Sequence, residues 1–167
     1  NTLGVNLAYF SDKPPHTTKE LIGRLKAEAQ LFNGWIIGTG YADAFLSDGP
    51  LTIAQLDEAF PHQPVFVNNI STLTGIVNSA GLRKLGITTA TKAVQGAIPV
   101  DPKTGKLTGQ LIGMPNVNAT AKVFGTYSRA LTMDTYRKAE KIYASNGFTT
   151  AQSYETTLED IRTMREA

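Results

Sequence analysis

The sequence predicts an α/β fold, in which a small mixed sheet is flanked by helices. Stretches with apolar side chains at helical spacing alternate along the chain with short runs of β-branched and aromatic residues. The clearest example is the stretch 64–86, which reads as a buried strand, a polar turn and a short helix. At 167 residues, 41% of them hydrophobic, the chain is long enough to bury a core.

The N-terminal part predicts a strand followed by a helix. Apolar and small or polar residues alternate over 3–9, and this period of two is typical of a strand. Thr17 and Glu20 have the spacing of a capping box, in which the two residues satisfy free amides at a helix start. Apolar residues then recur at helical spacing, so we expect a helix over 17–33.

A second strand and a second helix follow. The run Trp35, Ile36 and Ile37 predicts a short buried strand, and the two glycines of the segment 38–41 indicate a sharp backbone turn after it. A helix is expected from Thr52, because Gln55 completes another capping box. Pro61 ends that helix.

The stretch 64–86 is the most informative part of the chain. Residues 65–67 predict a strand that is buried on both faces. Asn68 and Asn69 favour a turn after it, because their side chains bond to nearby backbone groups. Asn78, or Ser79 beside it, can cap a helix, and Gly86 is placed for its left-handed end.

The remaining elements follow the same alternation. Turn residues at 101–105 predict a hairpin between two aliphatic runs, and Pro115 is placed to open a helix that reaches residue 124. A long helix is expected over 132–146. A strand at 148–154 and a helix starting near Thr157 complete the chain.

Composition excludes several classes of partner. The 16 basic and 14 acidic residues are scattered and give a net charge of +2, so we expect no nucleic-acid binding. No apolar run reaches the roughly 20 residues that span a bilayer, so we expect no membrane insertion. Cysteine is absent, which favours a cytoplasmic protein and excludes thiolate metal ligands.

Catalytic motifs are missing from the sequence. The two histidines, His16 and His62, have no second histidine at the spacing of a metal site. No Gly-x-Ser-x-Gly elbow is present for a serine hydrolase. The glycines at 38 and 40 lack the third glycine of a dinucleotide-binding loop. We therefore assign no catalytic and no metal-binding residue to this chain.

Several short motifs together resemble one known family, in their order and spacing over nearly the whole chain. They are GWIIGTGY at 34–41, PLT at 50–52, FP at 60–61, VNSA at 77–80, TGQL at 108–111 and GFTTAQ at 147–152. The chain is similar to metal-dependent amidohydrolases related to N-substituted formamide deformylase, in the third amidohydrolase domain family.

The resemblance implies a place for this chain in a larger enzyme. In the family a TIM barrel carries the metal site, and a long insertion follows the first barrel strand. Residues 1–147 resemble that inserted α/β domain, and residues 148–167 resemble a barrel strand and helix. The family's metal ligands lie outside this range, so the resemblance implies a divalent metal, zinc by expectation, in the whole protein and none bound by this chain.

Two positions depart from the family's pattern. Ala42 stands where the family usually has an aspartate, which leaves Asp43 as the nearest acid. Thr72 and Leu73 stand where the family commonly has Gly-His. The second change removes a polar group that would face the substrate, and we interpret both changes as those of a divergent member of the family.

Two functions follow as alternatives. In the first, the whole protein hydrolyses C–N bonds other than peptide bonds in a small molecule, and this chain forms a wall of the substrate pocket and is inactive alone. In the second, the chain is a noncatalytic binding or interaction module. Exposed apolar surface on its last strand and helix would allow self-association. The side chains expected to contact substrate are Tyr41, Asp43, Asn69, Ser71 and Asn78.

Overall fold

The computed structural model describes residues 4–125, 129–152 and 158–166. These residues form two compact units, one within Asn1–Phe124 and one within Gly125–Ala167, and each is described by itself. No helix in the described ranges is long and apolar enough to cross a bilayer.

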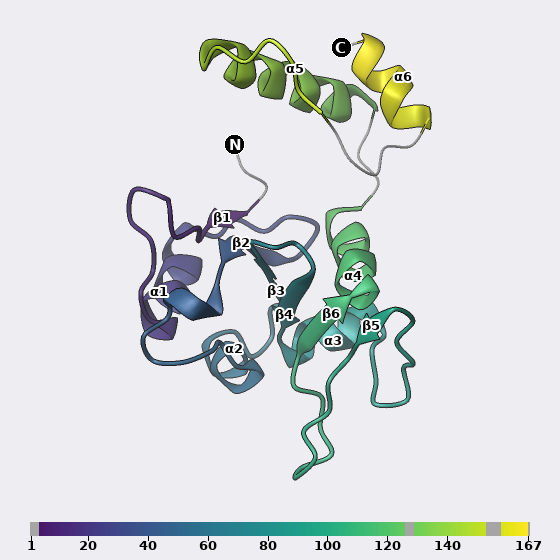
Figure 1. The fold of residues 1–167 in the computed structure, drawn as a ribbon. Helices are drawn as coiled ribbons and strands as arrows, with labels where there is room; N and C mark the ends of the chain where they lie inside the picture. Colours follow the sequence, from purple (N-terminus) through teal and green to yellow (C-terminus); the bar gives the residue numbers. More distant parts are fainter. Residues whose placement is uncertain (1–3, 126–128, 153–157, 167) are drawn as a thin grey trace. The chain divides into compact units, whose positions relative to one another are not determined.

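The first unit is built on a six-stranded sheet with the order β1-β2-β3-β4-β6-β5 (Figure 1). Strands β1, β2 and β3 are parallel, whereas β4, β6 and β5 add antiparallel neighbours. The predicted mixed sheet is therefore confirmed. The strands span Val5–Asn6 (β1), Ile36–Tyr41 (β2), Val65–Asn69 (β3), Thr74–Val77 (β4), Gly96–Ala97 (β5) and Gln110–Gly113 (β6).

Helices flank the sheet, and alternate residues of β3 divide the core into two clusters. Val65 and Val67 pack with the apolar residues of α1 and α2, whereas Phe66 packs with those of α3 and α4. All three side chains are fully buried, as expected for a strand covered on both faces. The helices are α1 (Thr18–Glu28), the short η1 (Asp43–Phe45), α2 (Ile53–Ala59), α3 (Ser79–Leu85) and α4 (Met114–Phe124).

The predicted helix caps are confirmed. The Thr17 side chain accepts a hydrogen bond from the backbone of Glu20, but the Glu20 side chain accepts one from the His16 backbone, so the capping box predicted there is only half formed. Thr52 and Gln55 form the full capping box. Asn78 caps α3, and Gly86 ends it in the left-handed conformation with φ 72°. These ends follow from interactions within a few residues, which sequence alone can show.

Strand β2 is longer than predicted, because it continues through the expected turn at 38–41 to Tyr41. Gly38 serves close packing and not a turn: a Cβ there would lie 2.6 Å from Leu7 Cδ1 and 3.0 Å from Leu25 Cδ2. Gly40 takes a φ of 85°, and the pairing with β3 shifts register beside it. The irregularity at Gly40 therefore lies within the strand and does not end it.

Two further boundaries were predicted wrongly. Asn68 and Asn69 belong to β3, and the turn lies beyond them, with Thr72 at a φ of 61°. That turn leads into β4, a strand that the sequence analysis missed. Helix α1 ends at Glu28, earlier than the predicted residue 33, because the chain turns back so that Phe32 bridges to Trp35.

The second unit contains α5 (Arg129–Ser145) and α6 (Leu158–Glu166), with an ion pair between Arg129 and Glu166. Residues 148–152 form no strand, which corrects the prediction for 148–154 in its described part, and Tyr154 and Thr157 lie outside the described residues. Several large apolar side chains of this unit are exposed, namely Ile142, Tyr143, Phe148, Leu158 and Ile161.

Candidate functional site

The three parallel strands end at the same edge of the sheet, and this edge carries most of the predicted site residues. In open α/β sheets, ligands bind outside the carboxyl ends of parallel strands. Tyr41 ends β2 and Asp43 follows in η1, while Asn69 ends β3 and Ser71 lies in the next turn. Tyr41 and Asn69 are register partners, so four of the five predicted residues come from adjacent strand ends.

Tyr41 is the buried member of this group, with 5% of its surface exposed. Burial raises the pKa of its hydroxyl above the usual tyrosine range, and the negative charge of Asp43 raises it further. A hydrogen bond with Asn69 lowers the pKa but does not offset the other two effects. Tyr41 is therefore a neutral hydroxyl at physiological pH, able to donate and to accept a hydrogen bond.

The turn after β3 is organised by Asn69. Its Oδ1 accepts a hydrogen bond from the Ser71 backbone at 2.9 Å, and its carbonyl oxygen accepts one from the Thr72 backbone at 2.9 Å. The Ser71 hydroxyl oxygen accepts a bond from the Leu73 backbone at 3.3 Å, and the Ser71 residue is exposed. The turn thus presents a hydroxyl on a fixed backbone.

Aromatic side chains that the sequence analysis did not assign to the site lie beside Asp43. The Phe45 ring stacks on Tyr9, with centroids 4.3 Å apart, and Phe10 packs edge-on against Tyr9 at 5.2 Å. All three are substantially exposed, and Phe10 is 70% exposed. Tyr9 and Phe10 follow β1, so this edge combines polar groups with an apolar patch.

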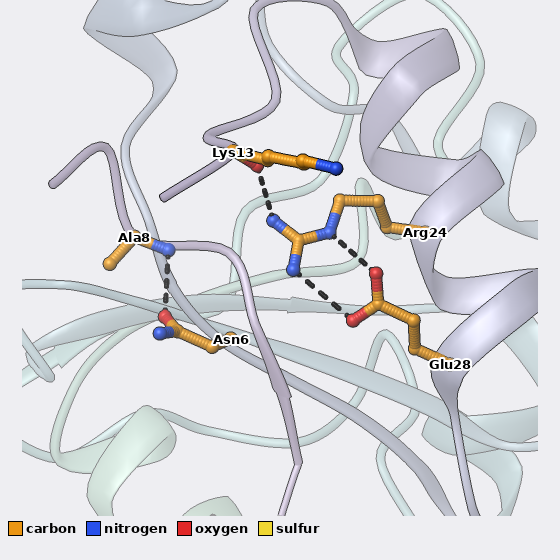
Figure 2. Close-up of polar contacts among 5 residues, drawn as sticks. All are labelled: Asn6, Ala8, Lys13, Arg24 and Glu28. Atoms are coloured by element: carbon orange, nitrogen blue, oxygen red, sulfur yellow. Dashed lines mark hydrogen bonds and ion pairs between the residues drawn. The ribbon is translucent and has the colours of Figure 1, made fainter. Parts of the chain in front are cut away.

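The segment that carries Tyr9 and Phe10 is tied to α1 (Figure 2). Arg24 donates to the carbonyl oxygen of Lys13 at 2.6 Å and binds both carboxylate oxygens of Glu28, at 3.0 and 3.1 Å. The Asn6 side chain accepts a bond from the Ala8 backbone at 3.1 Å, where the chain leaves β1. These contacts fix both ends of the segment.

Asn78, the fifth predicted residue, lies away from this edge and has a structural role. It is fully buried, and its Oδ1 accepts hydrogen bonds from the backbones of Val65 at 2.9 Å and Gly81 at 2.8 Å. Its Nδ2 donates to the carbonyl oxygens of Phe60 at 2.9 Å and Gln63 at 2.8 Å. These four bonds match the two acceptor sites and the two donors of an asparagine side chain.

A buried pair of asparagines was missed by the sequence analysis. Asn116, on α4, donates from Nδ2 to Asn68 Oδ1 at 3.0 Å and to the Thr72 carbonyl oxygen at 2.7 Å. Asn116 is 0% exposed and Asn68 is 8% exposed. The two residues are 48 positions apart, so no local pattern in the sequence connects them.

The possible metal ligands in the described part of the chain lie apart from one another. Within the described ranges, no three His, Cys, Asp or Glu side chains lie together. His16 and His62 are both exposed. Asp48 instead accepts hydrogen bonds from the Thr18 backbone and hydroxyl, at 2.8 and 2.7 Å, and so holds the start of α1.

A hollow of about 780 Å³ lies elsewhere, between α2, α3 and the hairpin at 99–108. Leu51, Leu82 and Leu107 contribute apolar surface, while Asp57 and Arg83 add charge. None of the five predicted site residues lines it. We therefore place the candidate site at the strand edge, where the polar groups converge.

Comparison with known proteins gives a consistent result. A family model described as the amidohydrolase family matches residues 1–167. A Bacillus subtilis protein named as an amidohydrolase, YtcJ, is 36% identical over 80 residues, which is 47% of this chain and 15% of that protein. Like the solved structures that follow, this relative is much longer than the matched region.

Two solved structures, both described as uncharacterised metal-dependent hydrolases, share the fold. The protein from Pyrococcus furiosus matches with a TM-score of 0.55 and 17% identity, and the match covers 98% of this chain and 31% of that one. The protein from Pyrococcus horikoshii matches with a TM-score of 0.54 and 21% identity, covering 98% and 30%. The chain thus spans less than a third of the solved structures it matches.

Proposed function

This chain belongs to the amidohydrolase family, and from that membership we propose that the whole protein hydrolyses C–N bonds other than peptide bonds in a small molecule. The match of the family model over the full 167 residues carries the proposal. The same proposal includes a relation to formamide deformylases. In it, residues 1–147 are a domain inserted after the first strand of a TIM barrel, and residues 148–167 are barrel material.

In this proposal the edge formed by β1, β2 and β3 is a wall of the substrate pocket. Tyr41, Asp43, Asn69 and Ser71 supply a neutral hydroxyl, a carboxylate, an amide and an exposed hydroxyl for polar contacts. Asn78 is left out of this set, because its side chain is enclosed and bonded to backbone groups. The exposed aromatic rings beside Asp43 would pack against the apolar part of the substrate.

A divalent metal, zinc in our proposal, would be held by residues outside this chain, since the described residues form no such site. When bound, such a metal activates a water molecule and polarises a carbonyl oxygen. The part of residues 1–167 is then to bind and orient the substrate.

The test uses the whole protein and a panel of N-formyl and N-acyl amines, cyclic amides and dipeptides. We expect turnover of non-peptide amides, loss of turnover after chelation, and recovery on adding zinc. The 167-residue chain alone should hydrolyse none of the panel. Turnover of dipeptides only would refute the bond specificity, and binding of the amides without turnover by metal-loaded whole protein would favour the noncatalytic module.

We also propose that the isolated chain associates with itself through the exposed apolar residues of its second unit. Ile142 and Phe148 are 64% and 59% exposed, values typical of an uncovered interface. Sedimentation velocity at rising concentration should show larger species, and Ile142→Lys should reduce them. A strict monomer at high concentration would refute this proposal.

A further inference from the structure

Asn68 lies one position before the end of β3, and its side chain faces α4, on the side of the sheet opposite to Tyr41 and Asn69. This polar side chain has an unused donor. Asn68 is 8% exposed. Its Oδ1 accepts a bond from Asn116, but its Nδ2 donates to no group in the described parts of the chain. Among the described residues, the fully enclosed side-chain atoms without a partner are Ser11 Oγ and Asn116 Oδ1. Asn68 Nδ2 is not one of them, so this donor is not fully enclosed.

The orientation of the Asn68 amide is set by Asn116. The Thr72 carbonyl oxygen can only accept a hydrogen bond, so the group that Asn116 points toward it, at 2.7 Å, must be Nδ2. The same Nδ2 lies 3.0 Å from Asn68, which must therefore present its oxygen there and turn its own Nδ2 away. Asn116 thus determines which end of the Asn68 amide remains free.

Asn116 itself has little freedom to change this arrangement. It is fully buried at the start of α4, and its backbone carbonyl oxygen accepts a bond from the Thr120 hydroxyl at 2.9 Å. Its Oδ1 occupies the space where a side chain at residue 75 would begin, and that residue is a glycine. The asparagine pair is therefore built into the packing between α4, β3 and β4.

We propose that Asn68 donates a hydrogen bond from Nδ2 to an acceptor oxygen of the substrate, with Asn116 as the positioning residue that turns the amide. This inference rests on the proposed function, since it takes the edge that carries Asn69 and Ser71 as the substrate-binding surface. The ligand class is a molecule with a carbonyl or carboxylate oxygen, which an amide NH₂ group recognises as a neutral donor.

Two substitutions separate this role from a purely structural one. Asn68→Asp keeps the acceptor for Asn116 and removes the donor toward the substrate. Asn116→Asp leaves Asn68 in place but replaces a donor by an acceptor, so Asn68 must turn its Nδ2 inward. Asn118→Asp is the matched control, because it makes the same charge change at an exposed position on the same helix.

The kinetic test uses the whole protein and an amide that it turns over. Loss of one hydrogen bond to the substrate should raise KM about tenfold in Asn68→Asp and in Asn116→Asp, with kcat little changed. The Asn118→Asp control should keep the parent KM. If Asn116→Asp does not fold, the uncharged Asn116→Leu should raise KM by a smaller factor. An unchanged KM in folded Asn68→Asp and Asn116 variants would overturn the proposal.

A binding test distinguishes failure of this inference from failure of the proposed function. The isotope-labelled 167-residue chain is titrated with N-methylacetamide, and the side-chain NH₂ signals of Asn68 are followed by NMR. We expect a saturable shift that is lost in Asn116→Asp and kept in Asn118→Asp, whether or not the whole protein is a hydrolase. Absence of an Asn68 shift at the highest N-methylacetamide concentration at which the chain stays folded would overturn the inference even where the enzyme is active.

Discussion

Replacing Asn78 by alanine should destabilise the first unit more than any surface substitution. The side chain is 0% exposed and makes four hydrogen bonds to the backbone, at 2.8 to 2.9 Å. At about 1 kcal/mol for each bond, the loss amounts to about 4 kcal/mol. Since a domain is stabilised by about 5–15 kcal/mol, this is a large part of the total. Asn78→Ser, which keeps a capping oxygen, should recover about 1 kcal/mol.

The assay is urea unfolding followed by the fluorescence of Trp35. This is the single tryptophan of the chain, and at 3% exposed it lies in the core of the first unit. The exposed Asn118→Ala serves as the control and should stay within about 0.7 kcal/mol of the parent. A loss below about 1 kcal/mol in Asn78→Ala would show that the four backbone groups find other partners, and would refute the reasoning.

Three further substitutions test other contacts, each by urea unfolding. Gly75→Ala should cost about 1–3 kcal/mol, because its methyl group would collide with Asn116; a neutral result would mean that Asn116 moves freely. Because the pKa of Tyr41 is raised in the folded chain, its hydroxyl loses the proton at a lower pH in the unfolded chain than in the folded one. The free energy of unfolding should therefore fall above about pH 10 in the parent, and it should fall less steeply in Tyr41→Phe. Hydrogen bonds from the Thr18 hydroxyl and backbone lower the pKa of Asp48. The stability that this carboxylate contributes is therefore present above its unfolded-state pKa and is lost as the pH falls through its folded-state pKa. Asp48→Asn should reduce this loss of stability in acid, and an unchanged acid profile would contradict that role.

Features that depend on neighbours within a few residues could be predicted from the sequence. The capping residues Thr17 and Thr52 and the left-handed Gly86 were placed correctly, because each contact spans three or four positions. The buried strand at 65–67 was also clear from its composition. Tyr41, Asp43, Asn69 and Ser71 are expected to contact substrate because they end or follow predicted strands, and the parallel strands bring them to one edge.

Features that depend on distant contacts could not be predicted. Gly38 looks the same in sequence whether it allows a turn or makes room for Leu7 and Leu25, and the structure shows the second. Asn68 favours a turn by its local preference, yet it pairs with Thr39 and Gly75 on the two neighbouring strands and so belongs to β3. The assignment of Asn78 as a substrate contact had the same origin, because burial is not visible in a capping motif.

The two outer strands of the sheet, β1 and β5, contain only two residues each. A longer outer strand would offer a row of free backbone amides and carbonyls, with which a strand of another polypeptide could pair. The outer strands of the described sheet offer few such unpaired backbone groups on either side. Fibrillar stacking of copies through the sheet is therefore disfavoured, even at the concentrations where side-chain association would begin.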